Sequence, residues 1–277
     1  MQTILSHISP TDVLVDPFPH IVVKNALPDE LTRQLLAALP SQEMLTKGEE
    51  PGSNKRFSYS AVDVFRSPPI APLWQEFIRV HTSAEFCADL LRIFGDHIVR
   101  LYSTFEKTVA PLSALRWGLR KRDDYSTHDI LIDTQICINT PVLEKPTAVK
   151  VAHVDNANKL FAGLLYLRLD SDTATGSDLE LYRFRDPRRV RFYGARLIED
   201  KYLKRVTTIP YERGTLVFFL NGFDSLHGVT VRSQTLSPRY FVNFLGEVKE
   251  PLFSLDGYME TWFGKVARVV HRKTHHY

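Results

Sequence analysis

The sequence predicts an α+β protein in which helices pack on one side of an antiparallel β-barrel, the β region forming either a sandwich or a jelly roll. Apolar residues at helical spacing dominate about the first 125 residues. Eight short β-rich runs separated by turns follow after about residue 127. The chain has 277 residues, of which 44% are hydrophobic, so it can bury a substantial core.

The N-terminal part is expected to be mainly helical. Residues 16–20 contain two prolines, which favour an extended backbone before a short strand at residues 21–23. Pro28 then begins a helix whose leucines recur at helical spacing. Residues 47–55 are polar and rich in turn formers, which predicts a loop, and two or three further helices are expected within residues 72–105.

The β region is expected to contain strands at residues 130–139, 149–153, 161–169, 179–184, 205–209, 215–220, 226–231 and 240–244. A last helix is predicted at residues 255–272. We interpret the chain as a single domain, with a helical support at residues 1–125, a β core at 126–250 and a basic C-terminal helix at 251–277.

Composition excludes several classes of protein. The net charge of +3 is too small for a dedicated nucleic-acid binder, so no nucleic acid is expected as a partner. The only cysteines, Cys87 and Cys137, exclude a disulfide scaffold and a zinc site built on cysteine pairs. There is no apolar run of the roughly 18 residues that a membrane span needs and no visible signal peptide. A cytoplasmic protein is therefore the expectation.

Two basic segments leave alternatives open. Residues 183–205 contain nine basic and three acidic side chains, which fits either a solvated face or a lip that attracts an anionic substrate. The predicted C-terminal helix places apolar and basic residues together, which fits packing on the domain, a homodimer interface, or peripheral contact with the inner face of a membrane.

The motif that carries chemistry is His153-Val154-Asp155. On a strand, residues two apart project from the same face, so the imidazole and the carboxylate point to one place. A second histidine, His227, begins another predicted strand 74 residues later. Two histidines and one carboxylate on one face of a metal ion form the facial triad of non-haem Fe(II) oxygenases, although the H-x-D triplet alone is a weak signal.

Arg239 adds a second, independent signal. If residues 237–244 form a strand, Arg239, Phe241 and Asn243 share one of its faces. An arginine inside a barrel needs a carboxylate partner, and no acidic residue lies nearby in that strand. A bound dicarboxylate could form a bidentate pair with it. The alternatives are a solvent-exposed side chain or a distant acidic partner.

Six ordered features together resemble the Fe(II)/2-oxoglutarate-dependent dioxygenase superfamily, and in particular its prolyl 4-hydroxylase-like branch. They are the segments PFPHIVVKNALPDEL, HVDN followed by GLLYL, GSDLELY, GTLVFF, HGV and RY. The resemblance covers residues 151–244 well and 16–39 loosely. Serine replaces the second glycine of the family's G-G-x-L strand, and the spacing from His227 to Arg239 is longer than usual.

The resemblance implies a double-stranded β-helix and a role for each matching residue. His153, Asp155 and His227 correspond to the iron ligands and catalytic centre. Arg239 corresponds to the residue that pairs with the distal carboxylate of 2-oxoglutarate, and Tyr166 to a hydroxyl donor to that carboxylate. The alternative for Tyr166 is an ordinary core tyrosine. The longer spacing leaves Arg232 as a rival anchor.

The implied activity is hydroxylation of an unactivated C–H bond by Fe(II), O₂ and the co-substrate 2-oxoglutarate, with release of succinate and CO₂ and with ascorbate as a candidate reductant. The substrate would be a small molecule, a sugar- or lipid-linked compound or a peptide, an anionic one being favoured by the basic segment. Two alternatives are a non-catalytic, metal-dependent sugar-binding or scaffold barrel and a cupin-like metal hydrolase. Asp155 favours oxygen transfer, since halogenating relatives usually lack the carboxylate.

Overall fold

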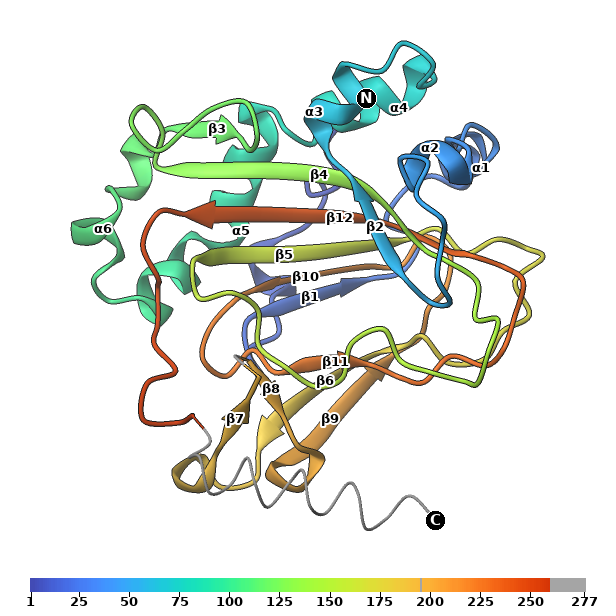
Figure 1. Cartoon of the computed structure of the whole chain (residues 1–277). Helices are drawn as coiled ribbons and strands as arrows, with labels where there is room; N and C mark the ends of the chain where they lie inside the picture. The colour runs from blue at the N-terminus through green and yellow to red at the C-terminus, as the bar shows by residue number, and fades with distance from the viewer. Residues whose placement is uncertain (195, 260–277) are drawn as a thin grey trace.

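The computed structural model describes residues 1–194 and 196–259, and places a helical layer against two facing β-sheets (Figure 1). The α-helices are α1 (Asp29–Ala37), α2 (Gln42–Leu45), α3 (Ala61–Phe65), α4 (Pro72–Val80), α5 (Ala84–Leu101) and α6 (Phe105–Thr108). The strands are β1 (His20–Val23), β2 (Arg56–Tyr59), β3 (Trp117–Leu119), β4 (Ile130–Asn139), β5 (Lys159–Tyr166), β6 (Leu179–Phe184), β7 (Phe192–Tyr193), β8 (Leu197–Ile198), β9 (Leu203–Ile209), β10 (Leu216–Leu220), β11 (His227–Val229) and β12 (Arg239–Val248).

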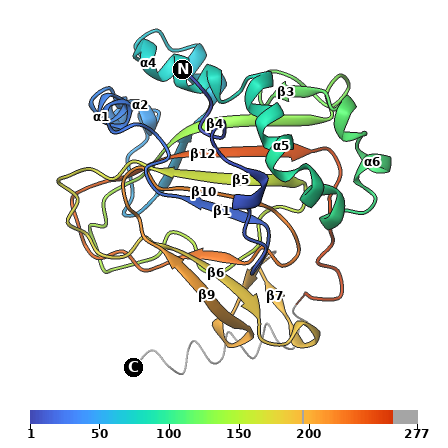
Figure 2. The same cartoon turned by 180° about the vertical axis from the view of Figure 1, so that it is seen from behind.

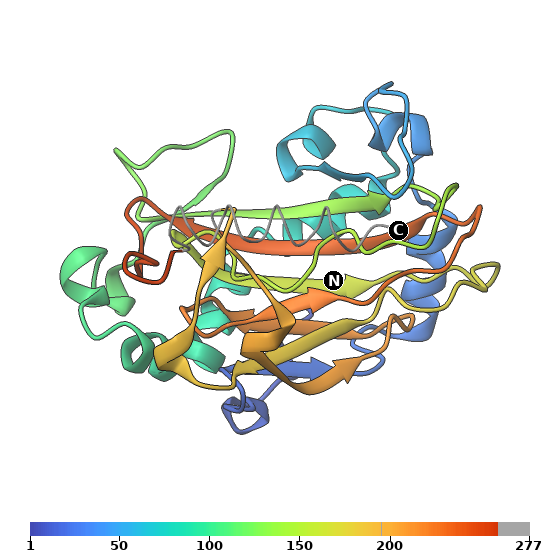
Figure 3. The ribbon, with the colours of Figure 1, turned by 60° about the horizontal axis from the view of Figure 1, so that its bottom comes forward.

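The larger sheet has seven strands in the order β1-β10-β5-β12-β4-β2, with β3 beside β4. All its pairings are antiparallel except that of β3 with β4. The smaller sheet has the order β11-β6-β9 and lies below the larger one in Figure 1. The same two layers are seen from the side of β6 and β9 in Figure 3. The short hairpin β7–β8 extends this lower layer.

Helices cover the outer face of the larger sheet, with α5 lying across it in the view from behind (Figure 2). The hydroxyl of Ser83 accepts a hydrogen bond from the amide of Phe86 and so caps the start of α5. Apolar residues of α5 at helical spacing, including Phe86, Leu90 and Phe94, are buried against this sheet in the main hydrophobic core.

The two long central strands separate two environments by alternation. In β4, Ile136 and Ile138 join the helix-side core, whereas Gln135 and Asn139 face the space between the sheets. Strand β12 repeats the pattern, with Val242 and Phe244 on the helix side. Its residues Arg239, Phe241, Asn243 and Leu245 line the space between the sheets. All ten residues of β4 are buried, because both of its faces are covered.

Several predicted elements agree closely with the structure. Strands β4 and β6 have the predicted bounds. The segment after the N-terminal prolines forms β1, and the helix expected at Pro28 is α1. Residues 47–55 contain no helix or strand. None of the helices in the described part of the chain has the length and apolar character needed to cross a bilayer.

One predicted element is wrong, and the predicted start of another is wrong. Residues 149–153 do not form a strand, since only His153 makes β-bridges there, to His227 and Leu197. The helix expected at residues 255–272 does not begin at 255, because residues 255–259 form a turn followed by a β-bridge between Met259 and Phe192. The rest of that helix lies outside the described residues.

Candidate active site

His153 and His227 lie directly opposite each other, although 74 residues separate them in the sequence. The amide of His153 donates to the carbonyl of His227 at 2.9 Å, and the amide of His227 donates to the carbonyl of His153 at 3.0 Å. Their ring centroids are 4.2 Å apart. Gly228 makes this approach feasible, because a Cβ there would lie 3.0 Å from the backbone nitrogen of Ala152.

Both histidines present the same ring nitrogen to the centre. Nδ1 of His153 is 2.8 Å from the carbonyl oxygen of Val151, and Nδ1 of His227 is 2.9 Å from that of Ser225. A carbonyl can only accept, so each Nδ1 carries the proton and each Nε2 offers a lone pair. Nε2 of His153 is buried and has no hydrogen-bond partner among the described residues. This is the arrangement of a metal-binding imidazole.

Asp155 completes the cluster. Its carboxylate oxygens lie 3.7 Å from Nε2 of His153 and 4.0 Å from Nε2 of His227, and one ligand atom from each of the three residues lies within 4.8 Å of the others. All three residues are buried. The lone pairs of two neutral imidazoles and one carboxylate converge here, and backbone carbonyls hold both imidazole rings in place. This donor set is suited to a divalent metal ion.

Two lysines compensate the charge of Asp155. Nζ of Lys159 lies 2.9 Å from one carboxylate oxygen and Nζ of Lys150 lies 3.3 Å from the other. Burial by itself would raise the pKa of Asp155, but the charge of Lys159, with a smaller contribution from that of Lys150, holds it well below its usual value. Burial, with a smaller contribution from the neighbouring His153, lowers the pKa of His227 to about 3. The cluster therefore holds one carboxylate and two neutral imidazoles at pH 7.

The triad opens on a cavity of about 480 Å³ between the two sheets. Its apolar wall includes Phe219, whose ring centroid is 4.8 Å from that of His227. Its polar wall includes Gln135 and Asn139 of β4 and Asn243 of β12. The amide of Asn243 donates to the side-chain carbonyl of Gln135 at 2.9 Å. The cavity thus combines a metal-ligand cluster with room for small organic molecules.

Arg239 lines the same cavity and has no acidic partner. Only 3% of it is exposed, and no ion pair joins it to any carboxylate of the described residues. Its Cζ lies 5.0 Å from the ring centre of Tyr166 and 4.5 Å from that of Tyr211. One terminal nitrogen donates to the carbonyl of Ser177 at 3.3 Å, while Nε has no partner in the described chain. A buried, uncompensated guanidinium is costly, and an anion from outside the chain would satisfy it.

Tyr166 is buried beside Arg239 and does not itself line the cavity. Its hydroxyl has no hydrogen-bond partner within residues 1–194 and 196–259. Burial raises the pKa of Tyr166 to about 12, partly offset by the charge of Arg239, so the hydroxyl keeps its proton at neutral pH. It is therefore a free donor beside an unpaired cation.

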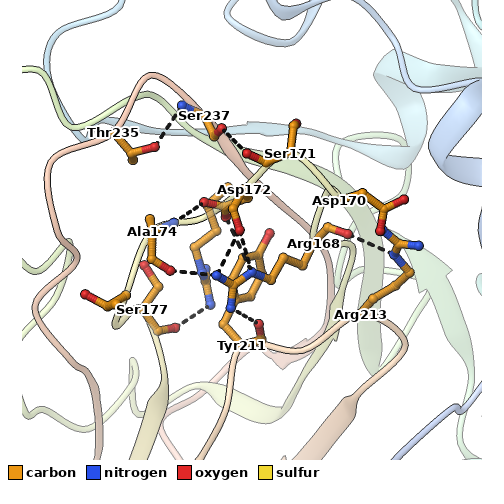
Figure 4. Close-up of polar contacts among 12 residues, drawn as sticks. Arg168, Asp170, Ser171, Asp172, Ala174, Ser177, Tyr211, Arg213, Thr235 and Ser237 are labelled. Carbon is orange, nitrogen blue, oxygen red and sulfur yellow. Dashed lines mark hydrogen bonds and ion pairs between the residues drawn. The ribbon is translucent and has the colours of Figure 1, made fainter.

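Arg232, the rival anchor, is already paired. Its guanidinium lies 2.9 Å from the carboxylate of Asp172 and 2.9 Å from the carbonyl oxygen of Ser237. Figure 4 shows the network around Asp172, in which Arg168 also donates to the backbone of the 172–174 segment. This network holds the loop that carries Ser177, and so it supports Arg239 from behind. Arg232 is not among the residues that line the cavity.

The structure brings together all three predicted metal ligands and places Arg239 in their cavity. Lys150, Lys159 and Arg56 also line this cavity and were not predicted from the sequence. Lys159 lies four residues after Asp155, and this spacing next to the H-x-D motif was an available signal. Lys150 and Arg56 left no signal, because a loop and an edge strand bring them in. Of the basic segment 183–205, only Arg196 lines the cavity.

Comparison with known proteins supports the fold. A prolyl 4-hydroxylase from Phytophthora capsici aligns with 96% of this chain and 74% of its own, at 16% identity and a TM-score of 0.52. The non-haem α-ketoglutarate-dependent carbocyclase SnoK from nogalamycin biosynthesis aligns with 97% of this chain and 93% of its own, at 14% identity and a TM-score of 0.51. No protein-family model matches the sequence, and a search of curated proteins found no similar one. The chain has the double-stranded β-helix fold predicted for it.

Proposed function

We propose that this chain is an Fe(II)- and 2-oxoglutarate-dependent oxygenase that hydroxylates an unactivated C–H bond and releases succinate and CO₂. The observation that carries the proposal is one cavity that contains both a buried His–Asp–His cluster and a buried guanidinium without a carboxylate partner in the described chain. A metal-ligand cluster by itself also suits a hydrolase, and a buried guanidinium by itself suits any anion-binding protein. A dicarboxylate that binds a metal ion at one end satisfies both features at once.

Each residue has a defined role in this proposal. His153, Asp155 and His227 would hold the metal ion through two imidazole nitrogens and a carboxylate oxygen. Arg239 would pair with the distal carboxylate of 2-oxoglutarate, and the hydroxyl of Tyr166 would donate a hydrogen bond to the same carboxylate. When bound, Fe(II) and 2-oxoglutarate would supply the oxidising chemistry, in which O₂ is reduced and the keto acid is decarboxylated.

The surrounding residues control access and protonation. Leu179, Phe219 and Val229 provide apolar surface around the ligand cluster and limit the water that reaches it. Lys150 and Lys159 keep Asp155 ionised and therefore able to bind a cation. The similarity in fold to two solved enzymes supports this assignment: one is named a prolyl 4-hydroxylase, and the other, SnoK, is named a non-haem α-ketoglutarate-dependent carbocyclase.

The decisive experiment is succinate formation from 2-oxoglutarate. Anaerobically purified protein should bind Fe(II) in a 1:1 ratio and, on addition of 2-oxoglutarate and O₂, release succinate slowly even without substrate, with ascorbate prolonging turnover. A metal-dependent binding barrel would hold the metal but release no succinate. A cupin-like hydrolase would contain stoichiometric zinc and would not respond to 2-oxoglutarate. Either result would remove the proposal.

A further inference from the structure

The cavity carries a surplus of positive charge. Among the described residues that line it, seven side chains are cationic and only Asp155 is acidic; the cations are Arg56, Arg120, Lys121, Lys150, Lys159, Arg196 and Arg239. Glu247 pairs with Arg120, and Asp63 pairs with Lys121, from outside the cavity. Seven cations therefore face three carboxylates.

A metal ion and its co-substrate would leave this surplus unchanged. The two positive charges of a divalent metal ion balance the two negative charges of 2-oxoglutarate. The distal carboxylate of 2-oxoglutarate would occupy Arg239, and Lys150 and Lys159 are already held by Asp155. Arg56 and Arg196 are the lining cations that have no carboxylate partner in the described chain and no role in holding the metal or the co-substrate.

Arg56 lies two strands away from Arg239, the residue proposed to bind the co-substrate. It pairs with Asn139 across β2 and β4, and Arg239 pairs with the same Asn139 across β12 and β4. The two arginines therefore flank Asn139 on three adjacent strands, with backbones roughly 10 Å apart by normal strand spacing. Their guanidinium carbons lie 4.9 Å and 4.8 Å from the ring centre of Phe241. Phe241 thus orients both groups.

The two arginines differ in exposure. Arg239 is buried, whereas Arg56 is exposed, because β2 is the edge strand of the larger sheet. Arg56 therefore lies where an incoming substrate meets the cavity, and Arg239 lies deeper. Within the described residues, the polar atoms of the Arg56 side chain make one long contact, of 3.8 Å, with the sulfur of Cys137, so the polar edge of the guanidinium is available to a ligand.

Arg196 approaches from the other layer. It lies in the connection of the β7–β8 hairpin, and its carbonyl accepts a hydrogen bond from the amide of Val154, within the metal-ligand motif. Its side chain lines the same cavity as Arg56. Two unpaired guanidinium groups thus reach the cavity from two different layers of the fold.

We infer that the substrate is an oxyanion, a carboxylate or a phosphate ester, and that Arg56 binds its charged group at the cavity mouth with Arg196 adding to the attraction. This inference rests on the proposed function and names the substrate class of the same site. A guanidinium matches the planar, bidentate geometry of both anions. Stacking on Phe241 pre-orients Arg56, which reduces the side-chain entropy lost on binding.

Binding of anions can be tested without turnover. Benzoate and phenyl phosphate would be titrated calorimetrically into protein saturated with Mn²⁺ and 2-oxoglutarate, with benzamide and benzyl alcohol as neutral counterparts. We expect at least one anion to bind the wild type, to bind Arg56→Gln at least fivefold more weakly, and to bind Arg56→Lys with intermediate affinity. The neutral counterparts should bind much more weakly than the anions. Which anion binds better distinguishes a carboxylate substrate from a phosphate one.

The controls separate this inference from the proposed function. Arg33→Gln removes an exposed arginine of α1 that does not line the cavity, and it should bind the anions as the wild type does. Thermal melting should show that Arg56→Gln remains folded. Failure to bind 2-oxoglutarate would count against the proposed function. The anions would then be titrated into the protein without Mn²⁺ and 2-oxoglutarate. Absence of anion binding to the wild type, or equal affinity in Arg56→Gln, would overturn the oxyanion site in either case.

Discussion

His153 and His227 exchange both of their backbone hydrogen bonds, at 2.9 Å and 3.0 Å, so each of these two candidate metal ligands fixes the position of the other. The pairing is an isolated bridge, not part of a long ladder for His153. Since each Nδ1 also lies within hydrogen-bonding distance of a nearby carbonyl, the two Nε2 atoms converge before any ion binds. Such preorganisation lowers the cost of assembling a metal site.

The first prediction concerns the ligands themselves. His153→Ala and Asp155→Ala should each weaken Fe(II) binding at least 100-fold and abolish succinate release, because each variant keeps only two of the three ligands. Asp155→Ala should also lower the free energy of unfolding by about 2 kcal/mol more than His153→Ala does, since Lys159 and Lys150 lose their common partner. Metal analysis and urea denaturation would check both parts, and equal stability of the two variants would contradict the second.

The second prediction separates the two buried arginines. Arg239→Gln should raise the KM for 2-oxoglutarate at least tenfold while changing the free energy of unfolding by less than about 1 kcal/mol, because no buried acid loses its partner. Arg232→Gln should leave that KM within about twofold but destabilise the protein by about 3 kcal/mol, because it breaks the buried pair with Asp172. The reverse pattern would make Arg232 the anchor.

The third prediction concerns Ser177, which has a φ of +67°. This left-handed conformation is unfavourable for a residue with a Cβ, and the Ser177 side chain makes no hydrogen bond to the described residues. Ser177→Gly should therefore raise the free energy of unfolding by about 0.5–1 kcal/mol while its carbonyl still accepts from Arg239.

The matched control for that prediction is its neighbour. Gly176 has a φ of +77°, and a Cβ there would lie 1.8 Å from the carbonyl oxygen of Val231. Gly176→Ala should accordingly destabilise the protein. Thermal denaturation of the two variants beside the wild type measures both effects, and a lower melting temperature for Ser177→Gly would refute the strain argument.

The fourth prediction concerns pH and His81, which is buried among aromatic rings. Its Nε2 accepts from the amide of Ile4 at 2.8 Å, and its Nδ1 lies 2.7 Å from the carbonyl oxygen of Phe77. Burial lowers the pKa of His81 to about 4, so the unfolded chain takes up a proton near pH 6.5 while the folded chain does not. His81 therefore contributes stability above pH 6.5 that is lost as the pH falls toward 4, up to about 3 kcal/mol.

His81→Gln tests this, because glutamine is neutral throughout that range. Urea denaturation of both proteins at pH 7.5, 6.0 and 5.0 should show a smaller loss of stability for the variant. Because His153 and His227 also have lowered pKa values, only the difference between the two proteins is assigned to His81. Parallel curves would exclude the assignment.

Sequence patterns predicted the parts of the fold in which residue types alternate regularly along a strand. Strand β4 was found with its bounds because isoleucines recur at alternate positions along it. His153, Asp155 and His227 were found because the weak H-x-D signal belongs to an ordered set of segments that resembles a known family. The segment before His153 was misjudged as a strand, since its apolar residues resemble one although only His153 makes β-bridges. Strands β2, β3, β7 and β8 are short, and their pairing depends on tertiary contacts that local sequence does not encode.

The charge of the cavity was beyond prediction for a similar reason. Arg56 and Lys150 come from an edge strand and a loop, and only the folded chain places them beside Arg239 and Asp155. The sequence located the basic segment 183–205 and left open whether it is a solvated face or a lip of the site. Arg183, Arg188 and Arg205 pair with acids away from the cavity, whereas Arg196 lines it.

The division of β4 and β12 into two faces has a consequence for how this protein could acquire new specificities. Gln135, Asn139 and Asn243 can be exchanged without altering the isoleucines and phenylalanines that hold the helices in place. A library randomised at alternate positions of these two strands should therefore yield mostly folded members with different ligand preferences, while a library at the intervening positions should yield mostly insoluble ones.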